Sequence, residues 1–254
     1  MPIELNLVPE VRGPLSVHPF VGARDHGVDA FVTDRFGGVG EGPYESLNLG
    51  DHVGDEHGTV LENRRRVAAA IGVALDQLLI VRQVHGTSVA LADSFDPDEH
   101  ADAIWGGSAE LALAILVADC LPVLLVDSSG DDFAVVHAGW RGLRSGVIAN
   151  VVSRFTDPRS VHAFIGPSIS PEGYQVGPEV AGNFLHIDRA VLADVGDRSR
   201  LDLRRVALEQ LRVLGVGDEN ISISTQSTDG GETFFSDRAA RPCGRFALVA
   251  RRAS

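Results

Sequence analysis

Hydrophobic and polar positions follow two different periods along the chain, and together they predict strands and helices in mixed order. Short apolar, β-branched runs are typical of buried strands, whereas apolar residues at helical spacing are typical of helices. The predicted strands span residues 28–33, 78–81, 88–92, 113–118, 123–126, 133–136, 161–165, 221–224 and 245–250. The predicted helices span residues 60–71, 140–155, 179–185 and 199–214. Because the two types do not alternate strictly, a mixed sheet with helices packed outside it is expected.

Two segments show neither period and are predicted to be loops. Residues 35–55 are polar and interrupted by many glycines, and long ordered loops of this kind often carry functional residues. Residues 93–102 are acidic and contain proline, which is typical of a surface loop. The longer of the two is therefore a candidate functional segment.

The length of 254 residues is enough to bury a substantial core in one large domain or two small ones. The longest apolar segment, residues 111–126, is interrupted by Asp119, Cys120 and Pro122 and is shorter than the ~20 residues that a membrane span needs. The first residues do not show the basic-then-apolar pattern of a signal peptide. Two cysteines are too few for a disulfide framework, so a cytoplasmic protein with free thiols and no membrane partner is expected.

Acidic residues outnumber basic ones, and 22 basic against 35 acidic residues give a net charge of −13. This charge disfavours a general nucleic-acid or anionic-membrane binder. All 22 basic residues are arginine. The absence of lysine excludes a Schiff-base lysine and a Walker-type phosphate loop. Any cationic side chain that contacts phosphate must therefore be an arginine.

Three residues with metal-binding side chains stand at the ends of predicted strands. His85, Cys120 and His137 each follow an apolar segment, and each is followed by a turn. Two imidazoles and a thiolate suit zinc or copper, and three protein ligands leave a position open for substrate. Their spacing matches no standard metal motif, so other roles stay open. Cys120 could be a nucleophile with His137 as its base, or each residue could be part of the core.

Short motifs spread over most of the chain resemble one protein family when they are taken together and in order. They are RFGGV at 35–39, SLNLGDHVGD at 46–55, ENR at 62–64, QVHG at 83–86, ADA at 101–103, ADCLPV at 118–123, HAGWRG at 137–142, IGP at 165–167 and YQVG at 174–177. The set resembles the YfiH family, also called laccase-domain proteins, multicopper polyphenol oxidase-like proteins or peptidoglycan editing factors. The combination of ADCLP with HAGWRG is its most specific part.

The resemblance implies an α/β fold in a single domain over residues 1–254. The expected architecture is a layered α-β-β-α sandwich with mixed sheets, similar to the catalytic domain of cytotoxic necrotising factors. The resemblance also implies a metal site at His85, Cys120 and His137 that holds zinc, with copper as the other candidate. The family often has further cysteines after IGP and near the C-terminus. Ser168, Gly173 and Ser224 stand in those regions here, so additional copper sites are not expected.

The activity that the resemblance implies is metal-dependent phosphorolysis of adenosine, inosine and methylthioadenosine, together with adenosine deamination. The expected partners are a purine nucleoside and phosphate, without nucleic acid, and a monomer is favoured. His85, Cys120 and His137 are the predicted catalytic residues, and the predicted substrate-binding residues are Asn48, Arg35, Arg64, Arg141 and Arg245. The arginines could instead be solvated or form salt bridges. Three alternatives remain: a copper-dependent polyphenol oxidase, a Cys–His hydrolase that edits peptidoglycan precursors, and a non-enzymatic binding protein.

Overall fold

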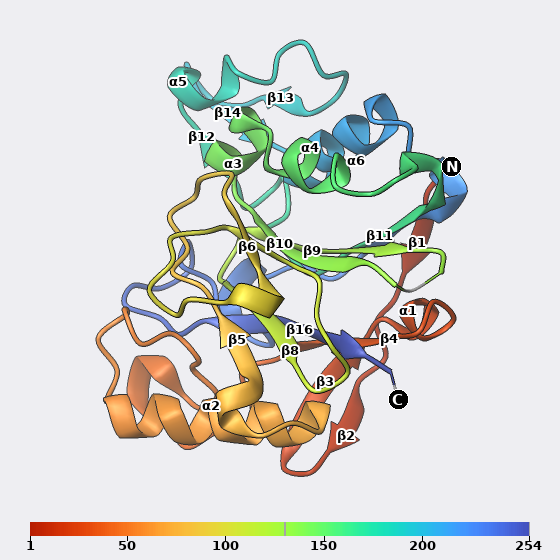
Figure 1. Ribbon diagram of the computed structural model, residues 1–254. Helices are drawn as coiled ribbons and strands as arrows, with labels where there is room; N and C mark the ends of the chain where they lie inside the picture. Colours follow the sequence, from red (N-terminus) through yellow and green to blue (C-terminus); the bar gives the residue numbers. More distant parts are fainter. Residues whose placement is uncertain (130, 254) are drawn as a thin grey trace.

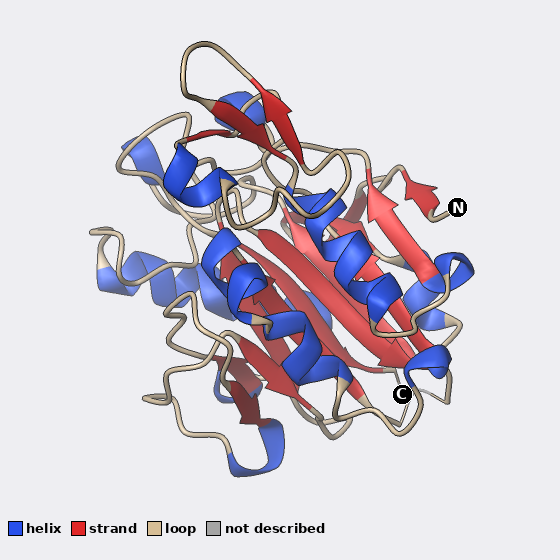
Figure 2. Cartoon of the chain, turned by 90° about the horizontal axis from the view of Figure 1, so that it is seen from above, coloured by secondary structure: helices blue, strands red, loops and turns tan. Residues whose placement is uncertain are grey.

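Two stacked β-sheets have helices on their outer faces in the computed structural model of the chain (Figure 1). The structure describes residues 1–129 and 131–253. Helices α3, α4 and α6 cover one sheet and α2 covers the other, so the layers follow the order α-β-β-α. Seen from above, the helices of the first layer lie across the face of the sheet beneath them (Figure 2). The predicted mixed α/β sandwich is confirmed, and the similarity to cytotoxic necrotising factors stays a prediction.

The first sheet has seven strands that come from almost the whole length of the chain. Their order is β1 (Ile3–Leu5), β15 (Ile221–Ser224), β11 (Val161–Ile165), β9 (Leu121–Asp127), β10 (Phe133–Ala138), β7 (Ala103–Trp105) and β6 (Val89–Leu91). The pairs from β11 to β7 are antiparallel, and the pairs at both edges of the sheet are parallel. This sheet is therefore mixed, as expected.

The second sheet joins both ends of the chain to its middle. Its strands lie in the order β2 (Glu10–Arg12), β3 (Leu15–Pro19), β4 (Val28–Thr33), β16 (Phe246–Arg252), β8 (Ala112–Val117) and β5 (Leu78–Ile80). The C-terminal strand β16 is antiparallel to both β4 and β8. A small third sheet consists of β12 (Gln175–Val176), β14 (Ser199–Leu201) and β13 (Val191–Ala193).

The helices are more numerous than the sequence predicts, and all the predicted ones except α2 are shorter than expected. They are α1 (Val21–Arg24), α2 (His57–Ile71), α3 (Trp140–Ser145), α4 (Val147–Val152), α5 (Pro178–Ala181) and α6 (Leu203–Val213), with short 3₁₀ turns at Gly42–Tyr44, Leu75–Gln77, Ala92–Ser94, Pro158–Ser160, Asp218–Asn220 and Asp229–Gly231. The single helix predicted over 140–155 is wrong, because Gly146 adopts φ 89° and divides it into α3 and α4. The helix predicted over 199–214 is wrong in its first turn, which forms β14 instead. No helix among the described residues is long and apolar enough to cross a membrane.

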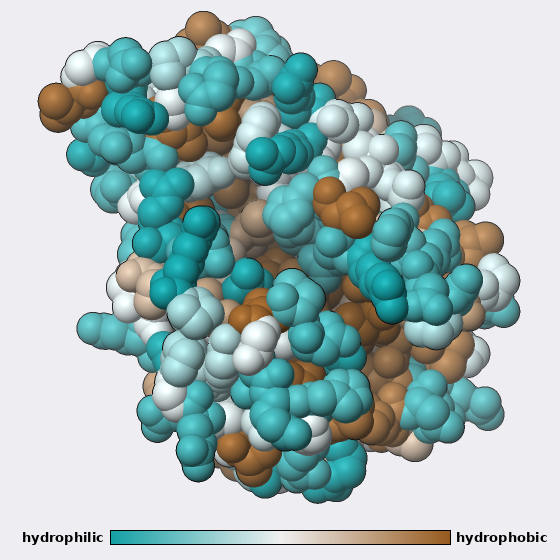
Figure 3. All heavy atoms as spheres, turned by 90° about the vertical axis from the view of Figure 1, so that its left-hand side faces the viewer, coloured by the Kyte–Doolittle hydropathy of each residue, from teal (hydrophilic) through white to brown (hydrophobic). Residues whose placement is uncertain are grey.

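Both faces of the central strands are buried, which explains their unbroken apolar sequences. In β9 and β10, one set of alternate side chains packs against the helices, and the other set faces the second sheet. Strand β8 likewise divides its side chains between the inter-sheet core and the core beneath α2. The molecular face seen in Figure 3 is mostly hydrophilic, with hydrophobic residues gathered toward its lower right. The two sheets thus form a rigid frame whose strand ends can hold a site.

Candidate metal centre

The ends of four neighbouring strands bring the three predicted metal ligands to one end of the seven-stranded sheet. His137 lies near the end of β10, and its register partner in the antiparallel strand β9 is Pro122. Cys120 immediately precedes β9, and Asp102 immediately precedes β7, which pairs with β10 on the other side. His85 lies in the connection that leads to β6, the parallel neighbour of β7. Antiparallel pairing therefore places residues that are distant in sequence beside one another.

The side chains of His85, Cys120 and His137 form a compact cluster. Their donor atoms all lie within 4.8 Å of one another, and the Cys120 sulfur is 4.0 Å from Nε2 of His85. The two imidazole rings meet edge to face, with centroids 4.7 Å apart. His137 is buried, Cys120 is half-buried and His85 is exposed. The cluster is therefore anchored in the core and open toward solvent at His85.

The buried carboxylate of Asp102 contacts both histidine segments. One of its oxygens lies 2.8 Å from Nδ1 of His137 and accepts the backbone N–H of His85 at 2.9 Å. The other oxygen accepts the backbone N–H groups of Val84 and Gly86. Ala101 and Asp102 are fully buried, so the surface loop predicted over 93–102 is wrong at its last two residues. Asp102 belongs to the sequence motif ADA, but it was not among the predicted site residues.

The Cys120 thiol and the His137 imidazole shift each other's protonation. Burial alone would raise the pKa of Cys120, but the neighbouring His137 and His85 outweigh burial and lower that pKa to about 6. Burial alone would lower the pKa of His137, whereas Cys120 and Asp102 together raise it to about 9. Cys120 is therefore a thiolate at neutral pH, which is the form that binds metals and attacks electrophiles.

The backbone around Cys120 is fixed by the residue that precedes it. Asp119 adopts φ 87°, which is unusual for a residue other than glycine, and its carboxylate is held on both oxygens. It accepts the Thr228 hydroxyl at 2.6 Å and the backbone N–H of Arg238 at 2.7 Å. Both oxygens of Asp119 are therefore hydrogen-bonded within the protein, which gives this residue a structural role. Gly139 lies against the sulfur as well, since a Cβ there would come within 2.8 Å of it.

Aromatic and arginine side chains line the surroundings of Cys120. Tyr174 is half-buried, and its pKa is raised to about 12, first by burial and then by the negative charge of Cys120. The positive charges of Arg238 and Arg141 act on the same hydroxyl in the opposite direction. Arg238 lies over the Tyr174 ring at 5.2 Å, and Arg141 lies over the Trp140 ring at 4.5 Å. Tyr174 and Arg238 were not among the predicted site residues, although Tyr174 begins the motif YQVG.

Arg141 differs from the other predicted substrate-binding arginines in having an uncommitted guanidinium. Its side chain is exposed, and within the described residues it forms no hydrogen bond or ion pair. The Arg35 side chain donates to the carbonyls of Glu45 and Gly231, and Arg64 donates to the Leu49 carbonyl. Arg245 donates to the Cys243 carbonyl and pairs with Asp237. Substrate contacts of these arginines stay predictions.

Asn48 lies inside the glycine-rich loop and is fully buried. Its carbonyl oxygen accepts the backbone N–H groups of Gly50 and Arg245, and its amide donates to the Gly50 carbonyl and to Asp55. All of these partners belong to the protein, so Asn48 joins the loop to the start of the C-terminal strand. Its predicted contact with the nucleoside stays a prediction.

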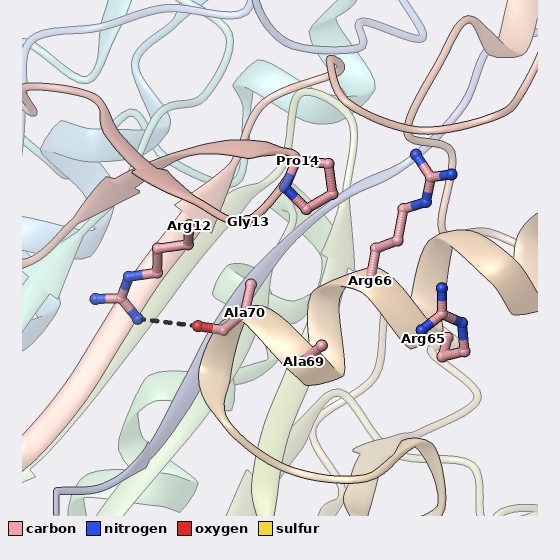
Figure 4. A pocket seen from close by; sticks show the side chains of 7 residues that line it. All are labelled: Arg12, Gly13, Pro14, Arg65, Arg66, Ala69 and Ala70. Atoms are coloured by element: carbon pink, nitrogen blue, oxygen red, sulfur yellow. Dashed lines mark hydrogen bonds between the residues drawn. The ribbon is translucent and has the colours of Figure 1, made fainter.

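A cavity of about 470 Å³ lies away from the cluster, between α2 and the turn that joins β2 to β3 (Figure 4). Its arginines are Arg12, Arg65 and Arg66, and all three are already paired with carboxylates. Arg12 also donates to the Ala70 carbonyl, as the dashed line in Figure 4 shows. Because its positive charges are balanced, this cavity is a weaker candidate site than the His–Cys–His cluster.

The donor set of the cluster suits a single metal ion. In a tetrahedral zinc site with bonds of about 2.0 to 2.3 Å, the donors lie about 3.5 Å apart. The three donors here lie within 4.8 Å of one another, so they would draw closer together by up to about 1 Å around a bound ion. Asp102 contacts only Nδ1 of His137, so Nε2 is the nitrogen that would bind a metal ion, which is the usual arrangement when a carboxylate supports a histidine ligand. The thiolate form of Cys120 completes the set. The residues therefore suit zinc or copper, with an open position toward solvent.

Comparisons with known proteins identify the family of the chain. A sequence model described as multi-copper polyphenol oxidoreductase laccase matches residues 29–253. A Shigella flexneri protein named purine nucleoside phosphorylase YfiH is 40% identical over 227 residues, which cover 87% of this chain and 92% of that protein. The chain belongs to the YfiH family. A purine nucleoside phosphorylase of Corynebacterium glutamicum is 35% identical over 89% of this chain and 95% of its own length.

Solved structures of the YfiH family share this fold. A Bacillus licheniformis protein titled YfiH has a TM-score of 0.87 and 27% identity, and the match covers 96% of this chain and 98% of that one. A Neisseria meningitidis protein has a TM-score of 0.84 and 32% identity, and the match covers 98% of this chain and all of the other. Both the sequence and the fold therefore confirm the family that the motifs indicate.

Proposed function

We propose that this member of the YfiH family is a metal-dependent phosphorylase of purine nucleosides. The observation that carries the proposal is the open cluster of His85, Cys120 and His137, whose three donors lie within 4.8 Å of one another. The names of the relatives supply the substrate class. We expect zinc in the site, with copper as the alternative, because both metals accept two nitrogens and one sulfur.

The reaction replaces the glycosidic C–N bond with a bond between the ribose anomeric carbon and a phosphate oxygen. The purine leaves with the proton that phosphate brings, so the products are a free base and ribose 1-phosphate. A bound metal ion would supply positive charge and an open coordination position beside the substrate. His85, Cys120 and His137 are the residues that would hold it.

The side chains near the cluster have separate tasks in this proposal. Arg141 binds phosphate, because its exposed guanidinium retains its donors and arginine forks match phosphate oxygens. Tyr174 offers a half-buried aromatic ring and a neutral hydroxyl close to Cys120, which suits contact with a base or a ribose. The glycine-rich loop is held in place by the other predicted substrate-binding residues, Arg35, Arg64, Arg245 and Asn48. Their contacts with nucleoside or phosphate are part of the proposal.

The proposal covers adenosine, inosine and methylthioadenosine as substrates, and adenosine deamination as a side activity. Purified protein loaded with zinc is incubated with each nucleoside, with and without phosphate, and the products are separated by chromatography. We expect the free base and a sugar 1-phosphate only when phosphate is present: ribose 1-phosphate from adenosine and inosine, and 5-methylthioribose 1-phosphate from methylthioadenosine. Deamination of adenosine to inosine should not need phosphate. If zinc-loaded and copper-loaded protein both leave every nucleoside intact, the proposal is wrong.

A second candidate is a cysteine hydrolase, and one observation favours it. Asp102 contacts Nδ1 of His137, and His137 lies beside the Cys120 thiolate, which is the order of groups in a catalytic triad. Alkylation of Cys120 by iodoacetamide separates the two functions. Zinc protects the thiolate if the residue is a metal ligand, whereas a catalytic thiolate reacts at the same rate with and without zinc.

A further inference from the structure

The carboxylate of Asp102 has every acceptor position occupied, and all its donors belong to the two histidine segments. Its four partners are the backbone N–H groups of Val84, His85 and Gly86 and the Nδ1 atom of His137. A carboxylate has about four acceptor positions, so Asp102 has none left for a metal ion. The residue is fully buried, and no bulk water competes for these bonds. Asp102 therefore acts on the site through its neighbours.

The first effect of these bonds is on the backbone at His85. This residue adopts φ 59°, in the left-handed region that side chains other than glycine rarely occupy. The three consecutive N–H groups around it converge on one carboxylate and form a concave anion-binding turn. A negative charge in that turn offsets the cost of the left-handed conformation. The direction of the His85 side chain toward Cys120 thus depends on Asp102.

The second effect is on the imidazole of His137. When Nδ1–H donates to the carboxylate at 2.8 Å, Nε2 is the nitrogen that a metal ion would bind after displacing its proton. The backbone adds to this link, because the N–H of His137 donates to the Asp102 carbonyl at 2.7 Å. One residue therefore sets both the tautomer of one histidine and the backbone conformation of the other.

We infer that Asp102 is a positioning residue that couples the two histidine ligands, so that metal affinity depends on its charge. This inference rests on the proposed metal site. Substitution by asparagine retains the size of the side chain but replaces one acceptor oxygen with an N–H donor. That donor must face either the Nδ1–H of His137 together with the N–H of His85, or the N–H groups of Val84 and Gly86. Both arrangements therefore oppose the turn at His85.

The test compares Asp102→Asn with Asp34→Asn, a matched change at another buried carboxylate. Asp34 is 3% exposed and accepts the backbone N–H of Phe36 at 2.8 Å, but it belongs to a different turn. Zinc affinity is measured by competition with a chelator, and thermal unfolding in EDTA reports the stability of each variant without metal. We expect Asp102→Asn to lower zinc affinity about 10- to 100-fold, as loss of a supporting carboxylate does, while Asp34→Asn retains wild-type affinity.

A measurement on the wild-type protein decides the case even if Asp102→Asn fails to fold. In zinc-loaded protein labelled with ¹⁵N, long-range proton–nitrogen spectra should show a protonated Nδ1 and a metal-bound Nε2 for His137. Binding of zinc through Nδ1, or wild-type affinity in Asp102→Asn, would overturn the inference about Asp102 alone. Absence of zinc binding by the wild-type protein would overturn both this inference and the proposed metal site.

Discussion

The sequence predicts functional residues both in the His85, Cys120 and His137 cluster and in the glycine-rich loop. In the structure, the polar side chains of these two regions have different hydrogen-bonding roles. At the strand ends, His85, Cys120 and His137 converge and keep donor atoms directed toward one another and toward solvent. In the loop over residues 35–55, Asn48 is fully buried, its amide oxygen accepts two backbone N–H groups, and its amide nitrogen donates two hydrogen bonds within the loop. The two regions therefore differ in the atoms that stay available for a ligand: the cluster keeps such atoms, whereas the side chain of Asn48 has none left.

Polar residues and glycines in a long loop can therefore mark a loop that is held in one conformation by its own hydrogen bonds. They do not by themselves indicate a substrate-binding site. The buried polar groups of such a loop need partners, and Asn48 supplies them. The metal-binding cluster, in contrast, is associated with backbone strain. His85 and Asp119 both adopt the left-handed conformation, which is unfavourable for residues other than glycine. Substitutions in the two regions should therefore affect different measured quantities.

The largest effect should come from removing the sulfur of the cluster. Cys120→Ala leaves two nitrogen ligands, so nucleoside phosphorolysis should fall by more than the ~100-fold typical of losing a supporting residue. Cys243→Ala is the matched control, because Cys243 is buried and contacts Arg245 rather than the cluster. Both rates are measured with zinc in excess. Equal losses in the two variants would contradict a role for Cys120 beyond packing.

The reactivity of Cys120 in metal-free protein should follow its lowered pKa. The pKa of about 6 means that the thiolate is present above that pH and is lost as the pH falls through it. The rate of iodoacetamide alkylation should therefore reach half its plateau near pH 6, whereas burial raises the pKa of Cys243 and keeps that thiol unreactive. Mass spectrometry of peptides distinguishes the two sites. A midpoint near pH 9 for Cys120 would contradict the thiolate assignment.

A change in the loop should lower stability rather than metal affinity. Asn48→Ala leaves several buried backbone groups without partners, and we expect a loss of about 2 to 4 kcal/mol in the free energy of unfolding. Asn220→Ala removes one exposed hydrogen bond and should change stability by less than about 0.5 kcal/mol. Denaturant unfolding measures both. A raised KM for nucleoside with unchanged stability in Asn48→Ala would instead support the predicted substrate contact.

The smallest predicted effect concerns Arg141, which forms no ion pair with any residue that the structure describes. Arg141→Ala should raise the KM for phosphate about tenfold, because one charge-assisted contact is worth roughly 1.5 kcal/mol. Arg144→Ala is the control, since Arg144 is also exposed and lies on the same helix. Steady-state rates at varied phosphate separate the two variants. Equal changes in KM would show that Arg141 acts only through the general surface charge.

Much of the fold could be predicted because the central strands have strong, one-dimensional signals. The apolar run over 161–165 coincides with β11, and the predicted helix that stops at Gly72 matches the end of α2, where Gly72 adopts φ 81°. The break at Gly146 could not be predicted, because a single glycine is tolerated within many helices.

That His85, Cys120 and His137 lie together could also be predicted, but the residues that hold them in place could not. His85, Cys120 and His137 stood out because each ends an apolar segment, and the family resemblance implied the same three residues. Asp102 lies at the end of an acidic segment that reads as surface, and only the pairing of β7 with β10 brings it to His137. Tyr174 and Arg238 reach the cluster through loops whose course no local pattern specifies.

The central claim is that His85, Cys120 and His137 bind one metal ion, and titration of metal-free protein with Co²⁺ tests it most directly. Cobalt takes the place of zinc and gives a thiolate-to-metal charge-transfer band when a cysteine is a ligand. We predict one equivalent per chain and a charge-transfer band in wild type and in Cys243→Ala, and no such band in Cys120→Ala. Absence of the band in wild type, or its persistence in Cys120→Ala, would contradict the claim.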